Sequence, residues 1–213
     1  MYLDKSITVY LEDLAARKAV PGGGSASALI GAVAGALCSM TANFTTGEKY
    51  KENAPKVERI LKDCTTLTGD CLRMVEEDVV AYSAIDRAHA MPKATESEKE
   101  VRTRALQEAL KGATRVPMAL FRRCGEILRL LDELVDICNT NLITDAGVSA
   151  YAAHAAMHGA RLNAEINCKY IKDTAFVANV RAEIDRATTE GDRIKGRVTE
   201  KVNSKLRAEG KSA

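Results

Sequence analysis

The chain has 213 residues, of which 46% are hydrophobic and 4% aromatic, and its formal net charge is +2. This length suits one domain with a substantial core, and a composition rich in alanine and poor in aromatics favours closely packed helices over a sheet. The small, evenly mixed charge argues against nucleic acid or an anionic membrane as a partner. The six cysteines form no CxxC pair and no signal-like segment is visible, so we expect buried, reduced thiols in a cytoplasmic protein.

Hydrophobic spacing predicts helices from the start of the chain. A first helix ends near Lys18. The uncharged stretch that follows predicts a fully buried helix over 25–46, with Ser25 near its cap. A long apolar stripe predicts a third helix over 54–90, which ends before Pro92 because proline cannot continue a helix.

Helices also account for the second half of the chain. Thr95 and Glu98 have the spacing of a capping box, which predicts the start of a helix that reaches about 116. Pro117 then either begins a new helix or kinks the old one, and the helical pattern continues to about 139. We expect an alanine-rich helix over 144–172 and a highly charged C-terminal helix over 174–213 with a frayed end.

We therefore predict an all-α fold, in which residues 1–213 form a single-domain bundle of long Ala/Gly-rich helices. The helices at 25–46 and 146–167 have extensive faces of small, uncharged residues. One small subunit could hardly cover these faces alone, so we expect a homodimer or a higher homo-oligomer formed by helix packing.

The stretch VPGGGSASALIGAVAGALCSM, residues 20–40, invites three interpretations. A phosphate loop needs Lys followed by Ser or Thr after its last glycine, and this stretch has neither. A membrane span is long enough, but serines, glycines and Thr41 dilute its apolar character. We prefer a turn before a buried helix. In this turn Gly22, Gly23 and Gly24 can take positive φ, and they and Ser25 offer N–H groups to an anion or flat ligand. A tight entry turn without a ligand is the alternative.

Two aspartates stand out among the predicted helices. Asp78 interrupts the apolar stripe of the long helix, and Tyr82 lies one turn further on. A buried carboxylate is costly unless it is paired or functional, so Asp78 is either a catalytic residue or half of a structural ion pair. Asp145 opens a helix that is otherwise almost uncharged, where complementing the helix dipole is a sufficient explanation.

Two polar pairs share the helix over 144–172. His154 and His158 have the spacing of a metal pair, but HAAMH lacks the glutamate of a zincin, so we expect surface or interface histidines and no metal. Asn163 and Asn167 are also four residues apart. Their amides could bind a heterocycle or form hydrogen bonds across a helix interface.

Several motifs, taken in order, resemble the cyclodeaminase/cyclohydrolase family. This family contains the cyclodeaminase half of formiminotransferase-cyclodeaminase and stand-alone methenyltetrahydrofolate cyclohydrolases. The resemblance implies all-helical subunits that dimerise, with folate bound near the subunit contacts. The motifs are PGGGSASAL (21–29), SMTANFTTGEKY (39–50), DVVAYSAIDRAHAMPKATESEKEVR (78–102), VPMAL (116–120) and NTNLITDAGVSAYAAHAAMHGARLNAEINCKYIKD (139–173).

The resemblance also implies roles for individual residues. The family's acidic active-site residue corresponds to Asp78, with Tyr82 as its aromatic neighbour. Lys93 could orient this carboxylate or contact substrate, and Asp145 is a second catalytic candidate or an acceptor for the pterin. The family's glycine loop, its Leu-Pro-Lys motif and its Ser-Asp motif correspond to Gly22–Gly24, Met91–Lys93 and Thr144–Asp145.

The activity implied by the resemblance is hydrolysis of 5,10-methenyltetrahydrofolate to 10-formyltetrahydrofolate, with the folate as substrate and no cofactor. A carboxylate can stabilise the amidinium cation and shuttle a proton. Formiminotetrahydrofolate cyclodeaminase, which releases ammonia, is the alternative, although the 213 residues include no formiminotransferase portion. A non-catalytic helical folate-binding or scaffold protein is a more distant possibility, and it predicts that Asp78 is dispensable.

Overall fold

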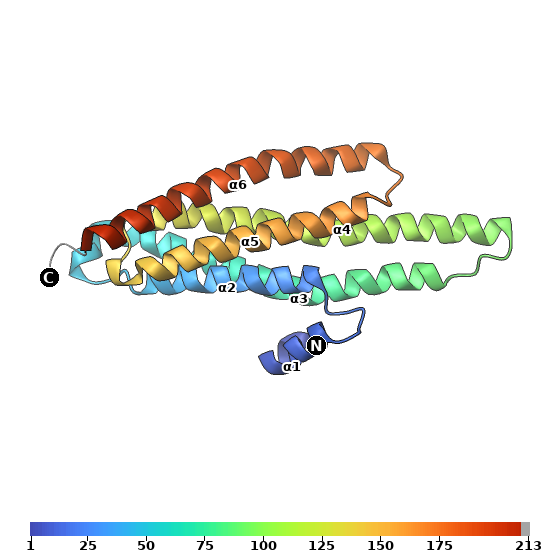
Figure 1. The fold of residues 1–213 in the computed structure, drawn as a ribbon, viewed down its shortest axis with the longest axis horizontal. Coiled ribbons are helices and arrows are strands. Elements are labelled where there is room, and N and C mark those ends of the chain that lie inside the picture. The colour runs from blue at the N-terminus through green and yellow to red at the C-terminus, as the bar shows by residue number, and fades with distance from the viewer. Residues whose placement is uncertain (210–213) are drawn as a thin grey trace.

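The computed structural model describes residues 1–209, and within that range it contains helices and no strand. The predicted all-α fold is therefore confirmed, while the frayed end expected at 210–213 lies outside the described residues. Figure 1 labels the six α-helices, and three short 3₁₀ turns connect or precede them. The helices are α1 (Ile7–Ala15), α2 (Gly23–Asn43), α3 (Ala54–Ala90), α4 (Glu96–Leu134), α5 (Ile143–Cys168) and α6 (Thr174–Glu209). The 3₁₀ turns are Tyr2–Asp4, Glu48–Asn53 and Thr140–Leu142.

Helix boundaries follow the sequence signals with small shifts. The long helix over 54–90 and the capping box of Thr95 and Glu98 are confirmed. Helix α2 begins at Gly23, two residues before the predicted start, because the glycines themselves form its first turn. Helix α5 ends at Cys168 rather than near 172, and α1 ends at Ala15 rather than near 18.

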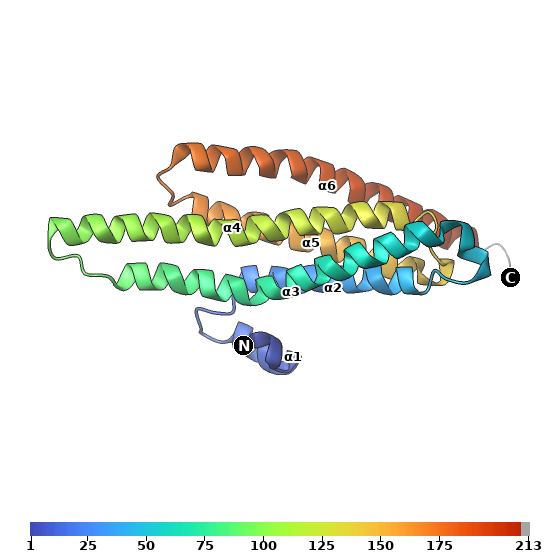
Figure 2. The same cartoon turned by 180° about the vertical axis from the view of Figure 1, so that it is seen from behind.

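Four of the helices form an antiparallel bundle in the cyclic order α2, α3, α4, α5, and α6 packs along α4 and α5 (Figures 1 and 2). The α3–α4 hairpin extends well beyond the other helices at one end. The core is built from aliphatic residues of α4, among them Leu128, Leu131 and Leu134, and from alanines and cysteines of α2, α3 and α5. All six cysteines are free and buried, as expected.

Small residues let α2 sit deep in this bundle. A Cβ on Gly35 would lie 2.4 Å from the Thr68 hydroxyl oxygen, so only glycine allows α2 and α3 to approach this closely. By length and composition α2 is apolar enough to cross a membrane. In this structure, however, its residues Ala28, Ala34 and Cys38 are buried against the neighbouring helices.

Helix α4 runs without interruption through Pro117, so of the two alternatives for this residue a new helix is excluded. Proline has no N–H, and the carbonyl four residues earlier, that of Ala113, therefore loses its usual partner. Asn167 of α5 supplies the replacement, since its Nδ2 donates to the Ala113 oxygen at 3.1 Å. The cost of proline inside α4 is thus reduced by a side chain from another helix.

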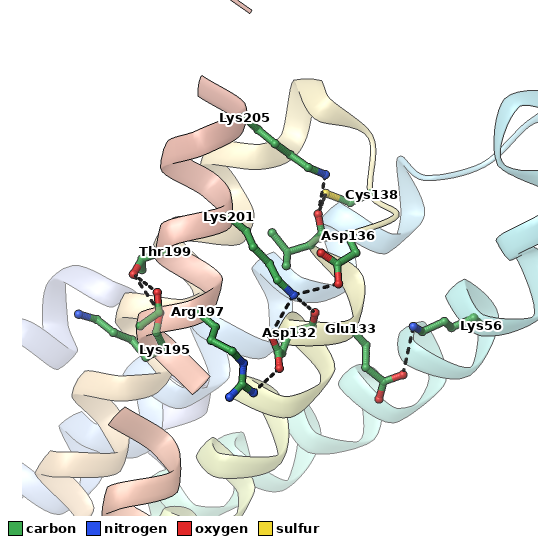
Figure 3. A network of polar contacts seen from close by, with 12 residues as sticks. Lys56, Asp132, Glu133, Asp136, Cys138, Lys195, Arg197, Thr199, Lys201 and Lys205 are labelled. Atoms are coloured by element: carbon green, nitrogen blue, oxygen red, sulfur yellow. Dashed lines mark hydrogen bonds and ion pairs between the residues drawn. The ribbon is translucent and has the colours of Figure 1, made fainter. Parts of the chain in front are cut away.

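Charged groups hold α6 on α4 (Figure 3). Asp132 forms ion pairs with Arg197 and Lys201, and Lys201 also reaches Asp136 at 2.9 Å. Lys205 donates to the backbone oxygen of Val135 at 2.6 Å, which satisfies a carbonyl at the end of α4. The charged helix predicted from residue 174 is therefore ordered by both ion pairs and burial of Ile184, Ile194 and Val198.

Candidate active site

A cavity of about 570 Å³ lies where α2 begins, beside the part of the α3–α4 hairpin that leaves the bundle. Its volume is in the range of small-molecule sites. Four helices contribute to its wall, and its lining combines aliphatic side chains with carboxylates, amides and tyrosines. The lining residues that carry the argument are Gly22, Gly23, Gly24, Asp78, Tyr82, Asp86, His89, Asn163, Asn167 and Tyr170.

Asp78 of α3 is half-buried and points its carboxylate at the first turn of α2. The backbone N–H of Ser25 donates to Asp78 Oδ2 at 3.0 Å. The N-terminus of a helix carries partial positive charge, so this position favours a carboxylate. Burial nevertheless raises the pKa of Asp78 above its ordinary value, and the hydrogen bond from Ser25 opposes that rise. No ion pair of Asp78 occurs among the described residues, which argues against the structural alternative.

Gly24 makes the approach of Asp78 possible. A Cβ built on Gly24 would lie 2.1 Å from Asp78 Oδ1 and 2.6 Å from its Cγ. The expectation of positive φ at the glycines is wrong, because Gly22 is the extended N-cap, with φ of −128°, and Gly47 is the one described residue with positive φ. The missing side chain of Gly24 provides space for the carboxylate and has no role in an unusual turn.

Gly23 faces the asparagines of α5 across the cavity wall. A Cβ on Gly23 would meet the Asn163 amide at 3.6 Å, which is an ordinary contact. The Asn163 Nδ2 donates to the Gly159 oxygen at 2.8 Å, and Asn167 bonds the Ala113 oxygen as described above. Neither Oδ1 atom accepts a hydrogen bond from residues 1–209, so both amides retain an acceptor that a heterocycle could use.

Ser25 does not line the cavity but supports it from behind. Its hydroxyl and the Tyr10 hydroxyl form a hydrogen bond of 3.0 Å, and both residues are buried. Burial raises the pKa of Tyr10, so its hydroxyl stays protonated. This hydrogen bond links α1 to the first turn of α2, where the Ser25 N–H binds Asp78. Tyr10 was missed by sequence reasoning, and no local pattern links it to Ser25.

Two further lining residues, Asp86 and His89, were not predicted as part of the site. Together with Asp78 and Tyr82 they follow one face of α3 at helical spacing, and this polar stripe was readable in the sequence. His89 is oriented by Arg102 of α4, whose Nη2 lies 3.3 Å from His89 Nδ1. The cavity therefore has a second acidic and a basic group further along the hairpin.

Besides Ser25, two predicted site residues, Lys93 and Asp145, do not line this cavity. Lys93 is exposed in the turn after α3, because that helix continues for about three turns beyond Asp78 and its last lining residue is His89. Asp145 lies in the first turn of α5, at the opposite end of the helix from Asn163. Eighteen residues at about 1.5 Å each separate these two positions by about 27 Å. Within one chain, Asp145 and Asp78 belong to different ends of the bundle.

Fold and cavity together define a helical protein with a ligand-sized cavity whose wall includes a carboxylate of raised pKa, an arrangement typical of enzymes. Residues 6–186 match the formiminotransferase-cyclodeaminase family. The chain belongs to this family.

Individual relatives agree with the family assignment. The chain is 36% identical to methenyltetrahydrofolate cyclohydrolase of Methylorubrum extorquens, over 95% of this chain and 98% of that protein. It is 31% identical to formimidoyltransferase-cyclodeaminase of Rattus norvegicus, over 88% of this chain but only 35% of the rat protein. The crystal structure of formiminotetrahydrofolate cyclodeaminase from Thermotoga maritima superposes with a TM-score of 0.87 at 28% identity, over 97% of this chain and 100% of that one.

Proposed function

We propose that the protein is a methenyltetrahydrofolate cyclohydrolase, which converts 5,10-methenyltetrahydrofolate to 10-formyltetrahydrofolate. The observation that carries the proposal is the Asp78 carboxylate, which faces a cavity of ligand size under the start of α2. Similarity to the Methylorubrum cyclohydrolase along nearly the full length of both chains supports the same activity.

The chemistry of the substrate suits this carboxylate. Methenyltetrahydrofolate carries a delocalised positive charge on the amidinium that joins N5 and N10, and an ionised Asp78 stabilises that charge. Asp78 then accepts a proton from water as the water oxygen bonds to the bridging carbon. The resulting tetrahedral intermediate carries a hydroxyl group. Its bond between carbon and N5 breaks as Asp78 returns the proton to N5, and the hydroxyl proton leaves to solvent as the formyl C=O forms, so the positive charge of the substrate departs as a proton. These reaction steps need only water and a group that carries a proton, so the proposal includes no cofactor.

The environment of Asp78 favours both halves of this cycle. A general base works best when its pKa lies near the operating pH, and burial moves the pKa of Asp78 in that direction. The apolar side chains of the cavity lower the local dielectric constant around the carboxylate and so strengthen its attraction for a cation. The acceptors of Asn163 and Asn167 lie where they can bind the N–H edge of a pterin.

Formiminotetrahydrofolate cyclodeaminase is the second candidate, and the Thermotoga structure favours it because the match covers that whole chain. In this reaction N10 attacks the formimino carbon, and ammonia leaves from the tetrahedral intermediate. Asp78 would give the departing nitrogen its proton. Both reactions pass through a tetrahedral carbon between N5 and N10, so one cavity can serve either.

The deciding experiment compares two substrates on one preparation. Loss of methenyltetrahydrofolate absorbance measures the cyclohydrolase, and ammonia release from formiminotetrahydrofolate measures the cyclodeaminase. We expect Asp78→Asn to reduce kcat by about 10²–10⁴ on the substrate that is used. Near-normal turnover by a folded Asp78→Asn protein would refute the assignment, and turnover of neither substrate by the unmodified protein would refute the proposed function.

We also propose that the chain forms a homodimer through the outer face of α2 and α5. This face, which we call the α2–α5 face, is built mostly of uncharged residues and exposes large apolar side chains: Ile30, Val33, Val148, Tyr151, Leu162 and Ile166. Monomeric proteins rarely expose a continuous apolar surface of this kind. Because Ile166 also lines the cavity, a second copy on this face would shield the bound folate from water.

A further inference from the structure

Two histidines of α5 and one aspartate of α6 converge away from the cavity. His154 Nε2 lies 2.7 Å from Asp192 Oδ1, and His158 Nε2 lies 3.0 Å from the same oxygen. The two rings are adjacent, with centroids 4.3 Å apart. None of the three residues lines the folate cavity. We call this group the α5–α6 triad.

The helices aim these side chains at one point for a simple reason. His154 and His158 are one turn apart on the face of α5 that packs against α6, and α6 runs antiparallel to α5. One donor atom from each member of the triad lies within 4.8 Å of the other two. Ionic contacts along the same seam, such as Arg181 with Glu165 at 3.1 Å, keep the two helices in this register.

The donor atoms have the chemistry of a transition-metal site. Imidazole nitrogens and a carboxylate oxygen bind Zn²⁺ at about 2.0–2.2 Å, which places neighbouring donors of a tetrahedral site about 3.3 Å apart. The two nitrogen–oxygen distances of the α5–α6 triad are only a few tenths of an ångström shorter. Small side-chain movements would therefore accommodate an ion.

We propose that His154, His158 and Asp192 form a binding site for a divalent first-row transition metal ion such as Zn²⁺. Three protein ligands leave the fourth position of a tetrahedral ion for water, and the Asp192 side chain is 52% exposed, so solvent reaches that position. Such an ion bridges α5 and α6 and fastens the C-terminal helix to the bundle. The sequence motif HAAMH lacked a third ligand, and the fold supplies it from a residue 34 positions after His158.

The site is independent of the proposed folate chemistry, and its test uses protein without a histidine tag. Zn²⁺ titration by calorimetry should give one site per chain, and Co²⁺ should give visible d–d bands without the thiolate bands that cysteine ligands would cause. We expect His158→Ala and Asp192→Asn to weaken Zn²⁺ binding by about tenfold or more, since even outer groups of metal sites contribute 10- to 100-fold. Added Zn²⁺ should raise the melting temperature of the unmodified protein and not that of the variants.

The third histidine of the chain, His89, provides the matched control, and His89→Ala should leave the Zn²⁺ affinity unchanged. Asp192→Asn preserves size at a half-exposed position, so it keeps the test valid if an alanine variant fails to fold. The proposal is overturned if the unmodified protein binds no Zn²⁺, if both variants bind it normally, or if Co²⁺ reports thiolate ligands. In the first of these outcomes, the α5–α6 triad is an ion pair only.

Discussion

Asp78 combines a cost to folding with a use in chemistry. Burial raises the pKa of its carboxyl, which means that the folded protein destabilises the ionised form relative to the unfolded chain. Below the pKa of the unfolded chain, about 3.9, the Asp78 carboxyl is protonated in both states and does not reduce the stability of the fold. As the pH rises from that value through the higher pKa of the folded state, this part of the stability is lost. At neutral pH Asp78 therefore reduces the stability that an uncharged residue would allow.

The first prediction follows from this loss of stability at neutral pH. Asp78→Asn should raise the melting temperature at pH 7.5 while abolishing most of the turnover, because the amide keeps the acceptor for Ser25 N–H and carries no charge. The difference in melting temperature should shrink as the pH falls below the folded pKa. Thermal melts of both proteins from about pH 3.5 to 8 measure it. A variant less stable than the unmodified protein at pH 7.5 would contradict the interpretation.

The second prediction concerns the glycine beneath this carboxylate. A methyl group on Gly24 would overlap Asp78, so Gly24→Ala must displace the carboxylate or the start of α2. Misplacing a catalytic group by about 1 Å can cost about 10² in rate, and we expect a loss of kcat of that order. Gly69→Ala in α3 is the control, because its methyl would meet nothing within 4 Å and Gly69 does not line the cavity. Equal activity of the two variants would show that the close approach at Gly24 has no catalytic role.

At the scale of elements, Asn167 connects α5 to a defect in α4. The Ala113 carbonyl lies where Pro117 provides no N–H, and the Asn167 amide fills the gap. An unsatisfied buried acceptor costs about 1–3 kcal/mol. Asn167 therefore has a structural task in addition to its place in the cavity wall, and its effect on binding must be separated from its effect on folding.

A double-mutant cycle tests this connection as the third prediction. Asn167→Ala should lower the free energy of unfolding by about 1–3 kcal/mol in the natural background. In a Pro117→Ala background residue 117 regains an N–H for Ala113, so the same substitution should cost much less. Denaturant unfolding of the four proteins gives the coupling energy. Additive effects would mean that the amide does not compensate for the proline.

At the scale of the whole molecule, the α2–α5 face is notable because its large apolar side chains remain exposed to water in a single chain. On this face Leu162 of α5 is 62% exposed and Val33 of α2 is 48% exposed. Burying such side chains is worth about 1.5–3 kcal/mol each, and this gain disfavours a monomer in water.

The fourth prediction is that sedimentation at micromolar concentration gives a dimer or larger species. Leu162→Arg should shift it toward the monomer, because the substitution introduces a charge into an apolar interface. Val101→Arg, at an exposed apolar residue of α4 outside this face, should leave the mass unchanged. A monomeric natural protein would contradict the proposed dimer.

Local patterns in the sequence determined which segments are helical and which residue is chemically unusual. Apolar spacing gave the helix over 54–90, and the Thr95–Glu98 pair gave the start of α4, because both signals act within a few turns of chain. Asp78 could be singled out for the same reason, since a carboxylate within an apolar stripe is visible without any knowledge of its neighbours.

Contacts between distant segments could be decided only by the tertiary structure. Continuity of α4 depends on Asn167, fifty residues after Pro117, and the ligand set of the α5–α6 triad depends on Asp192. The separation of Asp145 from Asp78 likewise follows from which ends of the antiparallel helices meet. Helical periodicity specifies the face on which a side chain lies, but only the packing of the helices specifies what that face meets, and the chemistry of a site depends on both.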